Sequence, residues 1–456
     1  RANGSILVVL DDDPTGTQAV HDVPVLTDWQ VDDFQWAFAQ IENTDAPPAV
    51  FVETNSRSLD PHSAREINAA VITNAVAAAR QKGVSVSFAS RSDSTLRGHY
   101  PLEPDVISET LAKLGEPAVD GVLLVPAFPE AGRVTIAGIH SVREAAGKLV
   151  PVGESEFAKD ATFGYSSSRL ADYAAEKSAG QWRSHDVLAL DLNAIRSGTA
   201  EIVDVLRQAT GGAPIAVDVV NEDDLLALAL GMLTAQAQGK TLLPRSGPSF
   251  IRALIAQRQR PPLTAAEIFS HIGESAPGGL IVVGSHVGVS TRQLAQLKAQ
   301  SPSLVEIEIR VANLLGDADR GPALAQIASQ IVQALKTGNV VVYTSRDLVK
   351  GDNPAASLDI ARKISRELYS ITALVVDQTR PRFVIAKGGI TSSDLARFGM
   401  RMRRAVVRGC LLPGIVSLWQ GQDGPGAGIP YVVFAGNVGD DFALSNVVNL
   451  LSANRS

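Results

Sequence analysis

The segment Ile6–Gln18 reads ILVVLDDDPTGTQ, so that five apolar residues run directly into three acids and a turn. A continuous run of Ile, Leu and Val is typical of a strand buried on both faces of a parallel sheet. Asp11, Asp12 and Asp13 then lie at the carboxyl end of the strand, where open α/β sheets bind ligands. Adjacent carboxylates repel one another, which indicates a bound cation, substrate hydroxyls or a general base. Helix capping or a solvated loop is the alternative interpretation.

A second group of polar residues follows the strand that we predict at Val84–Ala89. The segment Ser90–Gly98 contains two arginines, an acid and several hydroxyl residues. A guanidinium group is suited to hold a carboxylate, and Asp93 can accept a proton from a substrate hydroxyl. A surface loop with an internal salt bridge would have the same composition.

The arrangement of apolar segments predicts an α/β protein with two domains. Each domain is expected to be a largely parallel sheet flanked by helices, with the active site in a cleft between the domains. Proline, glycine and basic residues between 239 and 263 suggest the connection, so we expect domains at 1–245 and 246–456. The further strands expected in the first domain are Ala49–Glu53, Gly121–Pro126, Asp186–Asp191 and Pro214–Asp218.

The second half contains two glycine turns at expected strand ends. Phe383–Ala386 runs into Lys387-Gly388-Gly389, and Tyr431–Ala435 runs into Gly436. Glycines let the backbone approach a ligand closely, and Thr391 lies where a helix is expected to begin with free N–H groups. A tight capped turn predicts the same sequence, but two such turns in one domain indicate a nucleotide. Strands are also expected at Gly279–Gly284 and Val340–Tyr343.

Composition limits the classes of partner. The chain has 456 residues, a net charge of −7 and a pI near 5.6, which argue against a nucleic-acid partner. Cys410 is the only cysteine, so no intrachain disulfide can form. No apolar run approaches the roughly 20 residues that span a bilayer, and the opening RANGS lacks a signal-peptide pattern. We therefore expect a cytoplasmic protein without a membrane partner, and a homodimer as the default oligomer.

Several common catalytic motifs are missing from the sequence. It contains neither the P-loop spelling GxxxxGK[ST] nor the dinucleotide spelling GxGxxG. It also lacks HExxH, a His/Cys cluster and a GxSxG elbow. These absences leave the ligands of any metal unspecified.

Taken together, the segments resemble the four-carbon acid sugar kinase family over nearly the whole chain. Arg91 stands where the family usually has Lys, Val287 where several members have Ser, and Ile390 where Glu is common. Six motifs occur in the family's order: Asp12–Gly16, Arg91–Gly98, Pro126–Arg133, Gly284-Ser285, Gly388–Ser392 and Gly436–Gly439.

The resemblance implies an amino-terminal acid-sugar-binding domain and a carboxy-terminal nucleotide-binding domain. It implies transfer of the γ-phosphoryl group of ATP, with Mg²⁺, to a terminal hydroxyl of a tetronate, a 3-oxo-tetronate or a branched relative. Asp12 and Asp93 are the expected catalytic residues. The expected substrate-binding residues are Asp13, Thr15, Gly16, Arg57, Arg91, Ser94, Thr95 and Arg97. The expected ATP-binding residues are Ser285, Val287, Gly388, Gly389, Ile390, Thr391 and Gly436.

In this hypothesis Arg91 and Arg97 pair with the sugar carboxylate, and Asp12 or Asp93 accepts the proton of the attacking hydroxyl. A competing assignment places the base at Asp440, beside the second glycine turn. Two other functions stay open. One is a sugar-acid-binding protein without catalysis, and the other is an ATP-dependent ligase that activates a carboxylate. The identity of the acid sugar is not specified by these motifs.

Overall fold

The structure, a computed structural model, describes residues 5–44, 48–144, 147–270, 273, 275–311, 320–345 and 354–453. The chain divides into two units. The first contains the chain up to Gly16 together with Trp29–Gln259, and the second contains Thr17–Asp28 together with the chain from Arg260 onward. A segment from the beginning of the sequence therefore belongs to the second unit. Within the described ranges, no helix is both long enough and apolar enough to cross a bilayer.

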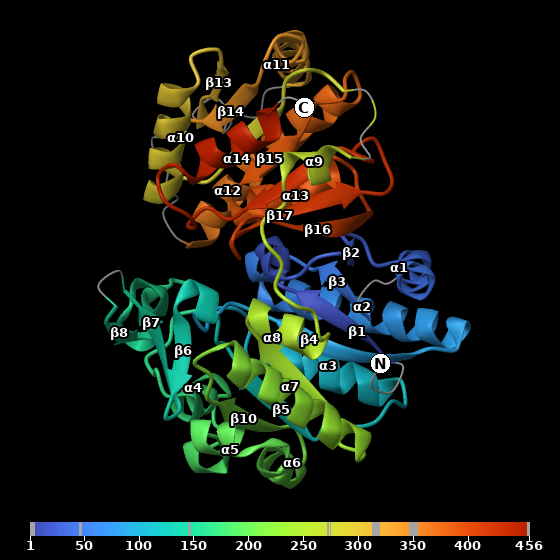
Figure 1. Cartoon of the computed structure of the whole chain (residues 1–456), viewed down its shortest axis with the longest axis vertical. Helices are drawn as coiled ribbons and strands as arrows, with labels where there is room; N and C mark the ends of the chain where they lie inside the picture. Colours follow the sequence, from blue (N-terminus) through green and yellow to red (C-terminus); the bar gives the residue numbers. More distant parts are fainter. Residues whose placement is uncertain are drawn as a thin grey trace. The chain divides into compact units, whose positions relative to one another are not determined.

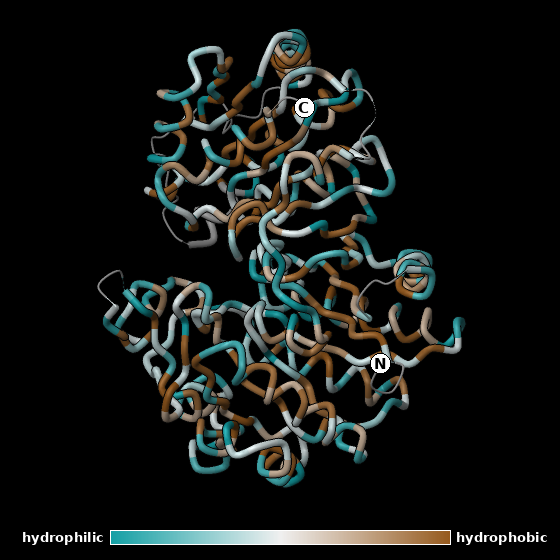
Figure 2. The backbone as a smooth tube through the Cα atoms, viewed as in Figure 1, coloured by the Kyte–Doolittle hydropathy of each residue, from teal (hydrophilic) through white to brown (hydrophobic). Residues whose placement is uncertain are grey.

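The first unit is built on a parallel sheet with the strand order β3-β1-β4-β11-β5-β10-β9. Several of its strands are buried along most of their length because their side chains are apolar on both faces. Figure 2 shows this hydrophobic character along the strands. The strands are β1 (Ser5–Asp11), β3 (Ala49–Glu53), β4 (Ser85–Arg91), β5 (Gly121–Val125), β9 (Leu188–Leu190), β10 (Ala213–Val217) and β11 (Leu242–Ser246).

Helices in two packed groups flank this sheet (Figure 1). The crossings through α2 (Pro61–Lys82) and α3 (Leu102–Lys113) move along the sheet in one direction. Those through α6 (Thr199–Gln208) and α7 (Glu222–Ala237) move in the other. Because parallel crossovers are right-handed, the two groups cover opposite faces. Other helices of this unit are α1 (Val31–Asn43), α4 (Leu170–Lys177), α5 (Leu192–Ser197) and α8 (Pro248–Leu254).

Local sequence explains where these helices begin and end. Asp60 precedes α2 and accepts hydrogen bonds from the N–H groups of His62 and Ser63, and Pro61 occupies the first helical position. Gly83 ends the helix in the left-handed conformation with φ 69°. The capping residue and the glycine fix both ends of this alanine-rich helix.

A strand and a helix of the first unit occupy part of 239–263, the range in which we expect the connection between the domains, and the division between the units falls after Gln259. Leu242–Ser246 forms β11, a buried strand between β4 and β5, and α8 follows it. The strand reads LLPRS, and a proline normally argues against a central strand because it cannot donate to the ladder. Because proline, arginine and serine interrupt its apolar pattern, the sequence does not predict this strand.

A small antiparallel sheet comprises β6 (Arg133–Ile136), β7 (Ile139–Arg143) and β8 (Leu149–Pro151). The turn between β6 and β7 is held by Asp218, whose carboxylate accepts hydrogen bonds from the N–H groups of Ala137 and Gly138 at 2.8 Å each. Asp218 follows β10, so this sheet is tied to the carboxyl end of a strand of the main sheet.

The second unit contains a mixed sheet with the order β13-β14-β12-β15-β18-β17-β16-β2. The first five strands in this order are parallel, and the last three are antiparallel to their neighbours. Its strands are β2 (Val23–Leu26), β12 (Leu280–Val283), β13 (Val305–Ile309), β14 (Val340–Thr344), β15 (Val384–Lys387), β16 (Arg404–Leu412), β17 (Val416–Gly421) and β18 (Pro430–Phe434). Its helices include α9 (Ala265–Phe269), α10 (Gly288–Gln300), α11 (Gly321–Ala334), α12 (Pro354–Val376), α13 (Gly389–Asp394) and α14 (Ala443–Ser452).

A buried polar contact holds the segment Thr17–Asp28 within the second unit. The indole Nε1–H of Trp419, in β17, donates to Thr17 Oγ1 at 2.8 Å, and the Thr17 and Ser417 hydroxyls lie 2.9 Å apart. Thr17 is 1% exposed and Trp419 is fully buried. Burial of an N–H group without an acceptor costs free energy, so this hydrogen bond favours the association of Thr17–Asp28 with the rest of the second unit.

We predict that Thr17→Val lowers the free energy of unfolding by about 1–3 kcal/mol, because the indole N–H loses its acceptor. Thr73→Val is the control, since Thr73 is exposed on α2 and its hydroxyl donates to the main-chain oxygen of Ala69 in the same helix. Urea unfolding followed by tryptophan fluorescence measures both variants. Equal stability of the two variants would contradict the structural role of the Thr17 contact.

Candidate functional site

Four neighbouring strands of the first unit bring polar residues into one row at the carboxyl edge of the sheet. Asp11 of β1 is in register with Glu53 of β3 on one side and with Arg91 of β4 on the other. Arg91 is in turn paired with Ser246 of β11. The sequence-predicted position of Asp11 to Asp13 at a strand end is therefore where the structure places them.

Arg91 organises the centre of this row. Its guanidinium group pairs with the Asp11 carboxylate, donates to the main-chain oxygen of Asp13 and lies 3.4 Å from Asp12 Oδ1. A Cβ atom on Gly16 would lie less than 3.0 Å from both Arg91 and Asp11, so only glycine fits beside this pair. Arg91 is 3% exposed, and this burial favours a positioning role over direct contact with substrate.

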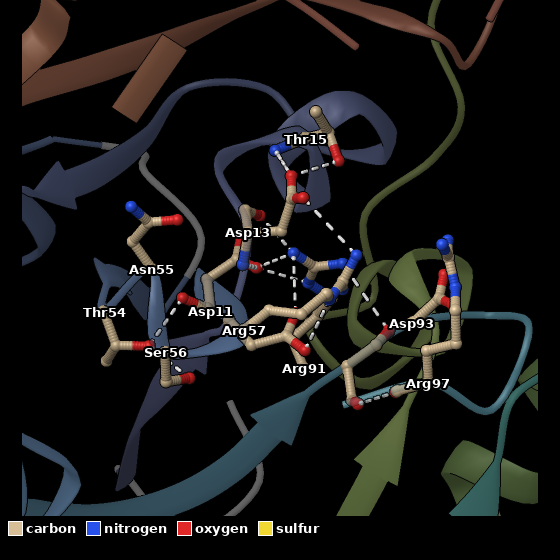
Figure 3. A network of polar contacts seen from close by, with 12 residues as sticks. Asp11, Asp13, Thr15, Thr54, Asn55, Ser56, Arg57, Arg91, Asp93 and Arg97 are labelled. Atoms are coloured by element: carbon tan, nitrogen blue, oxygen red, sulfur yellow. Dashed lines mark hydrogen bonds and ion pairs between the residues drawn. The ribbon is translucent and has the colours of Figure 1, made fainter. Parts of the chain in front are cut away.

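Arg57 binds the next two acids. It holds Asp12 in a bidentate pair, with Nε–Oδ2 and Nη2–Oδ1 distances of 3.1 and 2.6 Å, and reaches Asp13 Oδ2 at 3.4 Å. The other oxygen of Asp13 accepts from the N–H and hydroxyl of Thr15 at 2.9 and 2.6 Å. Figure 3 shows the guanidinium groups of Arg57 and Arg91 among these carboxylates. The predicted residues Asp12, Asp13, Thr15, Gly16, Arg57 and Arg91 thus form one cluster.

The predicted residues after β4 form a loop beside this cluster. Asp93 Oδ2 accepts from Arg97 Nε at 2.8 Å and from the hydroxyl of Thr95. Arg97 also lies 3.7 Å from the Asp160 carboxylate. The main-chain oxygen of Ser94 accepts from His140 at 2.8 Å. Both described hydrogen bonds to the Asp93 side chain therefore use the same oxygen.

The electrostatic environment separates these carboxyl groups into two kinds. Burial raises the pKa of Asp11 to about 7, opposed by Arg91 and reinforced by Asp12 and Asp13. Burial also acts to raise the pKa of Asp13 and of Asp93, but the positive charges and hydrogen bonds around them prevail and hold both pKa values below the usual range. Arg57 is the largest of these opposing charges in both cases, so Asp13 and Asp93 stay ionised.

Sequence analysis missed three further residues of this cluster. Glu53 and Glu103 are buried carboxyl groups, and burial raises both of their pKa values, that of Glu103 to about 7. Glu103 accepts from the Ser56 hydroxyl at 2.6 Å. Arg245 donates to the main-chain oxygen of Arg97 at 3.2 Å. Glu53 ends an apolar strand, and this position in the sequence could have identified it as a site residue. Glu103 lies within a helix and Arg245 in β11, a strand that the sequence does not predict, so neither could be identified in this way.

The predicted nucleotide-binding residues meet in the second unit. A Cβ on Gly436 would lie less than 3.0 Å from Ser285 Oγ, and one on Gly388 would lie 3.3 Å from the Ser285 backbone nitrogen. Lys387 links the two glycine turns, because its Nζ donates to Ala435 O at 2.6 Å. The structure therefore brings Ser285, Gly388 and Gly436 together from three different strand ends.

The other predicted nucleotide residues lie on the adjoining segments. Val287 is 46% exposed and precedes α10, so its apolar side chain faces outward. Gly389 and Ile390 begin α13, and Thr391 on the same helix is buried with its hydroxyl beside Gly284. Asp440 Oδ1 accepts from the N–H of Phe442 at 3.0 Å, which is a local turn contact.

The described residues do not form a ready-made set of protein ligands for the expected Mg²⁺. Among the described residues, no group of three or more histidine, cysteine, aspartate or glutamate side chains is arranged to hold a metal ion. Asp12 and Asp13 are instead engaged by Arg57.

We predict that Glu103→Gln weakens the pH dependence of stability. Because the folded pKa of Glu103, about 7, exceeds its ordinary value of 4.5, the folded state binds more protons between these values. The wild-type free energy of unfolding therefore falls as pH rises through this window, by on the order of 1–3 kcal/mol from this group. Urea unfolding from about pH 5 to about pH 7.5 should show a shallower fall in the variant. Glu109→Gln, exposed on the same helix, is the control; identical slopes in wild type and Glu103→Gln would refute the prediction.

Comparison with known proteins adds an independent observation. A sugar-binding N-terminal domain matches residues 7–254, and a nucleotide-binding C-terminal domain matches residues 280–444. A search of curated proteins finds no match.

Two solved structures share the fold. A Salmonella typhimurium LT2 protein, provisionally named a tRNA synthase, has a TM-score of 0.67 and 16% identity over 96% of this chain and 98% of its own. A Haemophilus influenzae protein of the family DUF1537 has a TM-score of 0.61 and 16% identity over 97% of this chain and 100% of its own. With a sugar-binding domain followed by a nucleotide-binding domain, this chain belongs to the four-carbon acid sugar kinase family.

Proposed function

We propose that this protein is an ATP-dependent kinase that phosphorylates a terminal hydroxyl of a small acid sugar. One observation carries the proposal. A single chain combines a sugar-binding domain, whose sheet edge presents paired arginines and carboxylates, with a nucleotide-binding domain whose glycine turns meet beside Ser285. A kinase needs these two sites, and the reaction requires the bound hydroxyl and the γ-phosphate to meet.

Asp93 is the residue that we propose to orient and deprotonate the attacking hydroxyl. Its described hydrogen bonds go to Oδ2, so Oδ1 is the oxygen that we assign to the substrate. The lowered pKa of Asp93 makes it a weak base. A weak base suffices because phosphoryl transfer passes through a loose transition state and depends mainly on positioning and charge stabilisation.

Asp12 is the second candidate for this role. Both of its carboxylate oxygens are bonded to Arg57, which makes Asp12 better suited to hold Arg57 in place than to accept a proton. Asp440, the third candidate, makes a local turn contact in the second unit. The three residues can be separated by substitution.

The glycine turns of the second unit are proposed to bind the phosphates of ATP through main-chain N–H groups. The glycines allow the main chain to come close to Ser285, where a side chain would not fit. ATP would be bound as its magnesium complex, and Mg²⁺ commonly takes many of its ligands from substrate phosphates and water. A cytoplasmic location and a homodimer stay predictions from the sequence.

The test is an assay of MgATP consumption against tetronates, 3-oxo-tetronates and branched acid sugars, with products identified by mass. We expect ADP and one acid heavier by one phosphoryl group. Asp93→Asn should lower kcat by about 10²–10⁴-fold, the usual contribution of a general base, and Asp440→Asn should stay near wild type.

Three results would count against this proposal. Formation of AMP or an acyl phosphate would favour a carboxylate-activating ligase. Binding of an acid sugar without any ATP binding would favour a non-catalytic binding protein. Full activity of Asp93→Asn together with loss of activity in Asp440→Asn would move the base to the second unit.

A further inference from the structure

Arg133 is a cation of the first unit that the described structure leaves without a counterion. It begins β6 and is half-buried. Its Nε is buried and has no hydrogen-bond partner, and no described carboxylate forms an ion pair with its guanidinium group. A buried charged donor without a partner is costly, so a site of this kind indicates a bound anion.

The acid nearest to Arg133 in the sequence is engaged elsewhere. Glu130 accepts from the Ser249 hydroxyl and from Arg252 Nη2, each at 2.7 Å. The main chain of Arg133 forms a closed pair of hydrogen bonds with Phe128, at 2.9 and 3.0 Å. The loop is therefore anchored without using the Arg133 side chain.

The face of β6 on which Arg133 lies is directed toward the Asp93–Arg97 loop. Side chains two residues apart share one face of a strand, so Arg133 and Thr135 lie on the same face of β6. Thr135 contacts His140 Nδ1 at 2.9 Å, and the other ring nitrogen donates to the main-chain oxygen of Ser94 at 2.8 Å. That face of the small sheet thus packs against the loop that carries Asp93.

Electrostatic interactions agree with this placement. Burial lowers the pKa of Arg133, and the charges that act on it are Asp93, which raises the pKa, and Arg97, which lowers it. A bound carboxylate would offset the cost of burying this charge.

Four other arginines of the cluster are already paired with acids or enclosed. Arg57 pairs with Asp12 and Asp13, Arg91 with Asp11, and Arg97 with Asp93 and Asp160. Arg245 is only 2% exposed and stacks over Tyr100 with 5.1 Å from its Cζ to the ring centroid. Arg133 combines partial exposure with the lack of an acidic partner among the described residues.

We propose that Arg133 binds the carboxylate of the acid sugar and so makes the site selective for sugar acids over neutral sugars. The inference rests on the proposed function, and it replaces Arg91 and Arg97 as the expected carboxylate ligands. A planar guanidinium group can hold a carboxylate through two parallel hydrogen bonds, and Asp93 beside it is left to bind hydroxyl groups.

The test compares binding of the acid sugar that is turned over with binding of its neutral alditol, by calorimetry. Arg133→Met should weaken acid binding by roughly 10- to 100-fold and change alditol binding by less than about 3-fold, because only the acid loses charge-assisted hydrogen bonds. Arg133→Lys keeps the charge but not the fork, so it should lose less acid affinity than Arg133→Met. Arg143→Met is the matched control, since Arg143 is exposed in the neighbouring strand β7.

The outcomes separate this inference from the proposed function. If wild type binds and turns over an acid but Arg133→Met keeps the wild-type ratio of acid to alditol affinity, the inference is wrong and the kinase proposal stands. If wild type neither binds nor phosphorylates any acid sugar, the proposed function and the inference both fail. Should Arg133→Met not fold, the acid-to-alditol ratio of Arg133→Lys decides in the same way, with an unchanged ratio overturning the inference.

Discussion

The first unit depends on the buried pairing of Arg91 with the carboxylates that follow β1. This one guanidinium group pairs with Asp11, lies near Asp12 and donates to the main chain of Asp13. Removing it would leave several buried acids without compensation, which is far more costly than the net stabilisation of an ion pair. Gly16 leaves room for the arginine, so the turn and the charge pairing require each other.

This pairing has a functional consequence for the outer part of the cluster. Carboxylates whose charge is balanced by buried arginines can lie close together. Recognition of a sugar with several hydroxyl groups needs such closely spaced acceptors. Arg57 pairs in the same way with Asp12 and Asp13. Its charge keeps Asp13 and Asp93 ionised. Buried pairs thus form the inner part of the cluster, while Asp93 and Arg133, which are less buried, are the residues that we propose to contact the substrate.

The sequence predicts those features that depend on local patterns. Apolar runs predict most strands of the main sheets, and β3 has the predicted bounds Ala49–Glu53. Association of Thr17–Asp28 with the second unit could not be predicted, because it depends on the long-range pairing of β2 with β16. Likewise, the sequence shows that Arg91 is charged but not that it is enclosed, and it gives no sign that Arg133 lacks a counterion. Burial and pairing are properties of the assembled fold.

Isotope tracing tests the central chemical claim, that the phosphoryl group is transferred to a hydroxyl and the carboxylate serves only for recognition. The acid sugar that is turned over is prepared with ¹⁸O in its carboxylate and incubated with unlabelled MgATP, and the products are examined by mass. The account predicts that both labelled oxygens stay in the carboxylate and that the transferred phosphoryl group carries no label. Labelled phosphate, or labelled AMP, after cleavage of the product with hydroxylamine would show activation of the carboxylate and would contradict the account.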